Sequence, residues 1–233
     1  IKGMSLDQLE MLAGEIRTRI IETVNRNGGH LASPLGVVEL TIALHYVFDT
    51  PEDKLIWDVG HQSYAHKLLT GRAGRFDTLR KRDGISGYPK ISESRFDSFG
   101  TGHSSTSISA ALGMAMARDH LGLHHHIAAV IGDGAMTGGM AFEAMNHAGH
   151  LGAKLLVILN DNEMSISRNV GALALYFNQL ITARPYKRAK QDVGSFVKTL
   201  IGNRITRTIQ DFEKSVKGFI TKGGLFQELG FNY

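Results

Sequence analysis

The sequence predicts an α/β fold in which a mostly parallel sheet carries helices on both faces. Two apolar runs of strand length, residues 127–131 and 154–159, flank a stretch of helical character over 137–150. Strand, helix and strand within about thirty residues is the pattern of a parallel crossover unit. Strands that are apolar along their whole length are typical of a sheet covered on both faces.

The other elements follow from apolar spacing and capping residues. Ser5 is a suitable N-cap for a helix whose apolar residues recur at helical spacing, and Gly28 and Gly29 end that helix. In chain order we predict helix 5–27, a mostly buried helix from Pro34 to Val47, a short strand at 55–57, a helix over 62–69, irregular surface over 71–100, a helix of small residues over 104–119, and two or three helices after 169 with a linker around 183–195.

The chain is interpreted as one domain over residues 1–233, with a possible mobile segment over 168–200. Its start at Ile1 carries no signal or transit sequence and reads like a chain caught partway along, so we expect residues upstream. The sequence has no cysteine, which excludes disulfides and thiolate metal sites and suits a reducing compartment. We therefore expect a cytoplasmic protein. Because the N-terminus reads as incomplete, a plastid location is not excluded.

The distribution of charge argues against a nucleic-acid partner. The net charge is +4, yet residues 184–222 hold ten Lys or Arg against three Asp or Glu, so the rest of the chain is net negative. The aromatic residues of this basic stretch show no stacking pattern, which favours a solvated helix or loop. Attraction of anionic substrates is the functional alternative. No apolar run of about 18 residues occurs, so no membrane partner is predicted.

The ends of the two apolar strands carry the chemistry. Gly132, Asp133 and Gly134 follow the first strand, and Asn162 follows the second. Both strands of a right-handed crossover unit point the same way, so these residues meet at the sheet edge where α/β folds bind ligands. A carboxylate and an amide oxygen suit Mg²⁺ or Ca²⁺, and phosphate oxygens would complete the coordination.

The glycines would admit a diphosphate close to the backbone, and a helix start near Thr137 would offer it free N–H groups. Either motif alone is also typical of a tight turn. The pair at this spacing favours a metal-bridged diphosphate.

Longer stretches resemble the 1-deoxy-D-xylulose-5-phosphate synthase family of thiamine-diphosphate enzymes, in the transketolase group. The spacing from Asp133 to Asn162 is similar to the thiamine-diphosphate signature of that group. The similarity extends from Leu31 through Phe231, and its most particular stretches are residues 57–62, 102–107, 132–149 and 158–167. The resemblance implies a thiamine-diphosphate-binding domain of the pyrophosphate type.

The resemblance also implies which residues form the site. Contacts to the cofactor are expected from His61, Gly102, His103, Ser104, Asp133, Gly134, Ala135 and Asn162. Mg²⁺ would be held by Asp133, Asn162 and the backbone carbonyl of Met164. Catalytic roles fall to His30, His61 and His103, with Ser33 near His30 in sequence. Histidine suits proton movement near neutral pH, although each of these could otherwise be a hydrogen-bonded loop histidine.

As an activity, the resemblance implies that pyruvate and glyceraldehyde 3-phosphate are joined with loss of carbon dioxide. The product would be 1-deoxy-D-xylulose 5-phosphate, a precursor of isoprenoids, thiamine and pyridoxal, and the enzyme would be a homodimer. In such enzymes a glutamate that activates the cofactor lies in later domains. We therefore expect residues 1–233 alone to be inactive, the remaining domains being elsewhere in the protein or on another chain.

Three alternatives stay open. The protein could be a transketolase-like enzyme for other sugar phosphates, which acceptor specificity would reveal. It could also be a non-catalytic subunit that binds thiamine diphosphate, or a nucleic-acid-binding protein whose binding depends strongly on salt.

Overall fold

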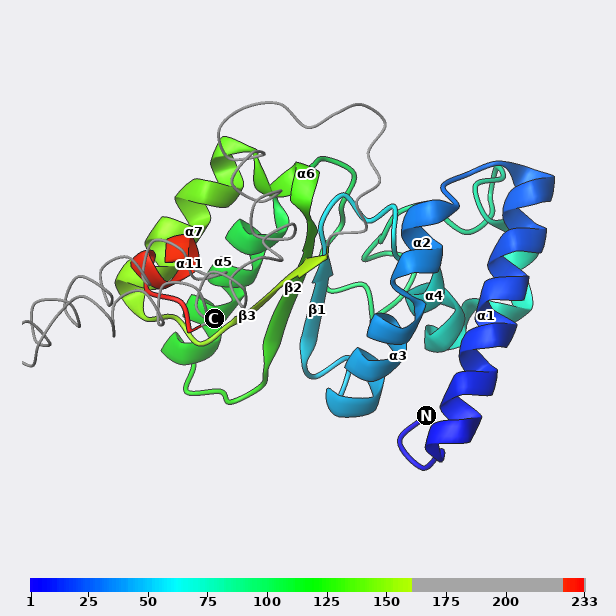
Figure 1. Cartoon of the computed structure of the whole chain (residues 1–233), viewed down its shortest axis with the longest axis horizontal. Coiled ribbons are helices and arrows are strands. Elements are labelled where there is room, and N and C mark those ends of the chain that lie inside the picture. Colours follow the sequence, from blue (N-terminus) through cyan, green and yellow to red (C-terminus); the bar gives the residue numbers. More distant parts are fainter. Residues whose placement is uncertain (161–223, 233) are drawn as a thin grey trace, which may run out of the picture. The chain divides into compact units, whose positions relative to one another are not determined.

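The computed structural model describes residues 1–160 and 224–232 (Figure 1). The chain divides into two compact units, residues 1–167 and 168–233, and each is described by itself. In the second unit the described element is helix α11 (Gly224–Glu228). The linker predicted around 183–195 and the mobile segment predicted over 168–200 lie outside the described residues, and of the region after 169, where two or three helices were predicted, the structure describes 224–232. The expectation of one domain therefore stays a prediction.

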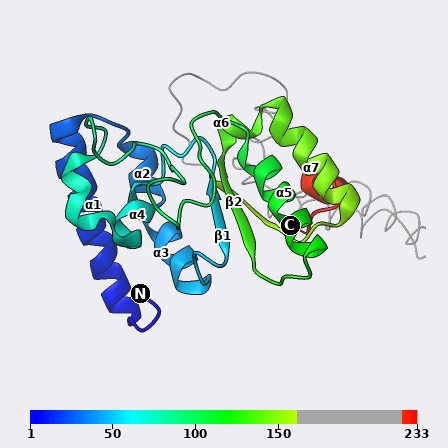
Figure 2. The same ribbon diagram turned by 180° about the vertical axis from the view of Figure 1, so that it is seen from behind.

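Three parallel strands form the sheet, in the order β1 (Lys54–Trp57), β2 (Ile127–Gly132) and β3 (Leu156–Asn160). Leu55 pairs with Ala128, and Val130 pairs with Ile158. Helices α1 to α4 lie on one side of this sheet and α5 and α7 on the other, as both views show (Figures 1 and 2). The predicted α/β fold with a covered parallel sheet is confirmed.

The N-terminal helices follow the predicted order with one break. Helix α1 (Leu6–Asn27) begins after Ser5, whose side chain forms a capping box with Gln8. The single helix predicted from 34 to 47 is wrong, because Val37 leaves the helical conformation at φ −116° and ψ 14°. Two helices result, α2 (Ala32–Gly36) and α3 (Val38–Val47). Leu44 of α3 packs against strands β1 and β2 in the core.

The segment after β1 departs further from the prediction. Helix α4 (Tyr64–Lys67) is short and continues into a π-helical turn over Leu68–Arg72 and a 3₁₀ turn over Ala73–Thr78. Beyond these turns the backbone is irregular, as predicted, but the segment is not mere surface. Its buried side chains are Arg72, Phe76, Leu79, Ile85 and Asp97. Most charged side chains of this stretch are exposed, as predicted, but Arg72 and Asp97 are buried and pair with each other.

The helices beside β2 and β3 have shifted boundaries. Helix α5 (Ser107–His120) begins three residues later than predicted, so His103 is not next to its start. The helix predicted over 137–150 is α7 (Gly139–Leu151), and a short helix that was not predicted, α6 (Asp133–Met136), comes directly after β2. Thr137 and Gly138 separate them. In the described part of the chain no helix has the length and apolar character to cross a membrane.

Candidate functional site

The carboxyl ends of the three strands open into one pocket. Asp58 follows β1, Asp133 follows β2 and Asn160 ends β3, so parallel pairing brings all three to the same edge of the sheet. The pocket has a volume of about 270 Å³ and is lined by Ser33, Asp58, Val59, His61, Gln62, Ser104, Gly132, Asp133, Gly134, Ala135 and Asn160. Five of the predicted site residues therefore line one cavity, namely His61, Ser104, Asp133, Gly134 and Ala135.

His30 and His61 lie beside each other at this site. His30 is on the turn after α1, and its ring meets that of His61 edge-on with 5.3 Å between centroids. Burial lowers the pKa of both imidazoles. The positive charge of Arg80 lowers the pKa of His30 further, and the neighbouring His30 does the same to His61. Both rings are therefore neutral at pH 7 and able to accept a proton.

Of the Gly102–Ser104 motif, only Ser104 lines the pocket. Gly102 and His103 are exposed and do not contribute to its wall in the described structure. A side chain at Gly102 would meet nothing within 4 Å. Their predicted contact with the cofactor stays a prediction.

Two loops of the site are fastened to each other through Ser105. Its hydroxyl donates to the carbonyl oxygen of Ala135 at 2.7 Å. The close approach also explains why residue 138 is a glycine, because a Cβ on Gly138 would lie 2.1 Å from the Ser105 Oγ. Ser105 itself has φ of 69°, in the left-handed region. Ser105 thus joins the loop before α5 to helix α6 and to the turn that follows it.

Sequence interpretation missed Asp58, Gln62 and Asn160. Asp58 is 1% exposed, and its carboxylate accepts the backbone N–H groups of Ser105 at 2.8 Å and Ser107 at 3.0 Å. It thereby joins the end of β1 to the start of α5. Asn160 donates from Nδ2 to the Gln62 Oε1 at 3.5 Å. The position of each polar residue at or just after a strand was the available signal.

The described residues fit a polar, anionic ligand. Buried nitrogen atoms at the site lack a hydrogen-bond partner within the described protein, namely Nδ1 of His30, Nδ1 of His61 and Nε2 of Gln62. Such groups cost free energy unless a ligand or water satisfies them. Asp133 brings a carboxylate, a preferred ligand of Mg²⁺, to the same cavity. Asn162 and Met164 lie outside the described residues, so the metal-ligand set stays a prediction.

Comparisons with known proteins give a consistent result. The sequence profile of a family described as 1-deoxy-D-xylulose-5-phosphate synthase matches residues 1–233. Curated proteins of that name are 57% identical in Desulforudis audaxviator and 59% identical in Syntrophotalea carbinolica. Each match covers 100% of this chain and 37% of the relative. The chain thus spans little more than a third of their length.

Solved structures of transketolases share the fold. A transketolase from Campylobacter jejuni aligns with a TM-score of 0.63 at 25% identity, over 70% of this chain and 29% of that one. A transketolase mutant from Pichia stipitis gives a TM-score of 0.62 at 22% identity, over 68% of this chain and 27% of that one. The arrangement of strands and helices is therefore that of this group of enzymes.

Proposed function

The chain belongs to the 1-deoxy-D-xylulose-5-phosphate synthase family, and from this premise we propose that it carries the diphosphate-binding half of that enzyme's site. The complete protein would condense pyruvate with glyceraldehyde 3-phosphate, releasing carbon dioxide and giving 1-deoxy-D-xylulose 5-phosphate. The observation that carries the proposal is the pocket at the carboxyl edge of the sheet, where predicted cofactor residues and unpartnered buried nitrogens meet.

The proposed cofactor is thiamine diphosphate with Mg²⁺. When bound, it supplies the carbanion and the electron sink for decarboxylation. Asp133, with Asn162 and the Met164 carbonyl, would hold the ion. Ser104, Gly134 and Ala135 would contact the diphosphate, and Gly102 and His103 would reach it from the exposed loop.

The chain's own contribution to the chemistry is placement and proton movement. His30 and His61 are neutral because burial lowers the pKa of each, so either can take a proton from a reacting group and return it. Asp58 fixes the position of the loop that carries Ser104 by holding the N–H of the next residue. The catalytic roles of His30, His61 and His103 are part of this proposal.

We further propose that the enzyme is a cytoplasmic homodimer. Its partners would be small substrates rather than nucleic acid or membrane. The chain spans 37% of its curated relatives, so residues outside it would supply the groups that activate the cofactor and bind the substrate phosphate.

The test is an assay of the full-length protein with pyruvate, glyceraldehyde 3-phosphate, thiamine diphosphate and Mg²⁺. We expect carbon dioxide release that depends on both substrates, with 1-deoxy-D-xylulose 5-phosphate as the product identified by mass spectrometry. Residues 1–233 alone should release none. Ketol transfer between sugar phosphates without pyruvate would instead favour the transketolase-like alternative, and cofactor binding without turnover would favour a non-catalytic subunit.

A further inference from the structure

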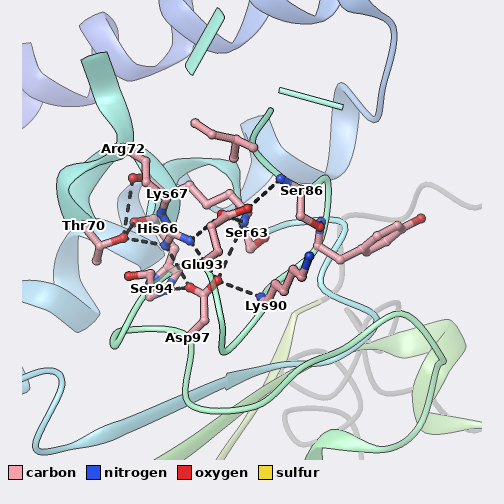
Figure 3. A network of polar contacts seen from close by, with 12 residues as sticks. Ser63, His66, Lys67, Thr70, Arg72, Ser86, Lys90, Glu93, Ser94 and Asp97 are labelled. Atoms are coloured by element: carbon pink, nitrogen blue, oxygen red, sulfur yellow. Dashed lines mark hydrogen bonds and ion pairs between the residues drawn. The ribbon is translucent and has the colours of Figure 1, made fainter. Parts of the chain in front are cut away.

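Four charged side chains, three of them buried and that of Glu93 15% exposed, form a cluster on α4 and the segment that follows it. This ion cluster consists of Lys67, Arg72, Glu93 and Asp97 (Figure 3). Lys67 binds Glu93 at 2.6 Å, and Arg72 holds Asp97 through two nitrogens, each at 2.8 Å. Arg72 also contacts Glu93 at 2.8 Å. Charge-assisted, bidentate bonds of this kind combine strength with fixed geometry.

The two carboxylates of the ion cluster also hold the backbone of a neighbouring loop. Glu93 accepts the N–H of Ser86 at 2.7 Å, and Asp97 accepts the N–H of Lys90 at 2.8 Å (Figure 3). These two N–H groups stand on either side of Tyr88. The cluster therefore fixes both ends of the short segment 86–90.

This segment contacts the residues proposed for catalysis. The half-buried ring of Tyr88 meets the ring of His30 edge-on, with 6.2 Å between centroids. Pro89 packs against Gly60, where an added Cβ would lie 2.3 Å from the proline Cδ. Gly60 immediately precedes His61. The carbonyl oxygen of Pro89 also accepts the N–H of Thr101 at 3.3 Å, next to the Gly102 loop.

His30 is held on a second side by the helix that carries Lys67 of the ion cluster. The hydroxyl of Tyr64 accepts the backbone N–H of His30 at 3.4 Å. Tyr64 and Lys67 belong to the same helix, α4. The helix and the segment 86–90 thus approach His30 from two directions, and the ion cluster joins one to the other.

We propose that Tyr88 and the carboxylates Glu93 and Asp97 are positioning residues for His30. The ion cluster fixes the segment 86–90, and the Tyr88 ring then limits the orientations open to the His30 imidazole. Locked supporting residues of this kind hold reacting groups within a few tenths of an ångström of productive geometry. The inference rests on the proposed function, which puts His30 beside the reacting centre.

The decisive variants are Tyr88→Ala and Tyr88→Phe in the full-length enzyme. Tyr88→Ala should lower kcat by about ten- to a hundredfold, since small misplacements near a reacting centre cost that much. The affinity for thiamine diphosphate and the KM for pyruvate should change less than about threefold. Tyr88→Phe should keep the kcat of the wild type, because the aromatic ring and not the hydroxyl makes the contact with His30. Glu93→Gln, which keeps one acceptor but loses the charge, should give an intermediate loss.

A second readout does not depend on activity. Diethyl pyrocarbonate modifies accessible neutral histidines, and peptide mass spectrometry of the cofactor-free protein would report the rate at His30. Tyr88→Ala should raise that rate several-fold while the exposed His103 serves as an unchanged reference. Glu39→Gln, which removes an exposed ion pair with Arg17 on α1, is the matched control and should change neither readout.

The outcomes separate this inference from the proposed function. An active wild type whose Tyr88→Ala variant keeps kcat and the His30 modification rate within twofold would overturn the positioning role. So would a fall in kcat that is matched by an equal loss of cofactor affinity or of folded protein, since that would indicate a general structural role. An inactive wild type would contradict the proposed function. Even then, a higher rate of His30 modification in Tyr88→Ala than in the wild type would support the contact between the two rings.

Discussion

The ion cluster and the pocket are both polar, yet they differ in how their polar groups are paired. In the ion cluster each charged side chain meets one of opposite sign, although Nε of Arg72 has no hydrogen-bond partner within the described protein, and Lys67 is 0% exposed. At the pocket, Nδ1 of His61 and Nε2 of Gln62 have no hydrogen-bond partner within the described protein, nor has Nδ1 of the adjacent His30. Charges that neutralise one another hold a structure together, whereas unpartnered polar atoms around a cavity indicate a binding site.

The largest effect should come from breaking the ion cluster. Asp97→Ala leaves Arg72 without its bidentate partner and should lower the free energy of unfolding by about 3–5 kcal/mol, since it strands a buried charge. Urea unfolding of the full-length protein measures this loss. Glu39→Gln, in an exposed pair, should cost less than about 1 kcal/mol. Equal losses for the two variants would contradict the distinction between the cluster and ordinary surface charge.

Removing a pocket carboxylate should spare stability and abolish binding instead. Asp133→Ala should weaken Mg²⁺-dependent binding of thiamine diphosphate at least a hundredfold, about 2.7 kcal/mol. The unfolding free energy should change by less than about 1 kcal/mol, because Asp133 lies on the pocket wall at the end of β2. Calorimetric titration of thiamine diphosphate with Mg²⁺ into the full-length wild type and variant measures the two affinities. An unchanged affinity would remove Asp133 from the proposed metal site.

A smaller effect concerns acid stability, through two histidines that extend the ion cluster. His66 donates from Nε2 to Asp97 at 3.0 Å, since the carboxylate can only accept. Its Nδ1 then accepts from the Nε2 of His45 at 2.9 Å, and the Nδ1 of His45 accepts the hydroxyl proton of Thr50 at 3.1 Å. With both rings neutral, each hydrogen bond of this chain has one donor and one acceptor, and burial lowers the pKa of both histidines.

Burial, aided by nearby His66 and Lys2, lowers the pKa of His45 to about 3. The unfolded chain binds a proton near pH 6.5, so stability is complete above that pH and falls as the pH drops toward 3. The slope should reach about 1.4 kcal/mol per pH unit. Urea unfolding at pH 7.5, 6 and 5 would show it, and His45→Asn should flatten the curve. If His45→Asn keeps the full slope of unfolding free energy against pH, the acid sensitivity comes from other groups.

Much of the site could be predicted because its residues follow regular elements. Asp133, Gly134 and Ala135 come directly after an apolar strand, and parallel pairing carries them to the edge of the sheet where the pocket lies. The helix boundaries were less predictable. Asp58 accepts the N–H groups of Ser105 and Ser107, and this contact between distant segments delays the start of α5. No local pattern in residues 104–107 reveals that partner.

By itself the sequence determined two things: the alternation of apolar strands and helices predicted the covered parallel sheet, and contiguous motif stretches carried the resemblance to the family. Only the tertiary structure decided that the charge-rich stretch after α4 turns inward, that Asp97 meets Arg72, and that Tyr88 lies against His30. The physical reason is that irregular segments have no repeating pattern. Their conformation is set by a few specific contacts between residues far apart in the chain.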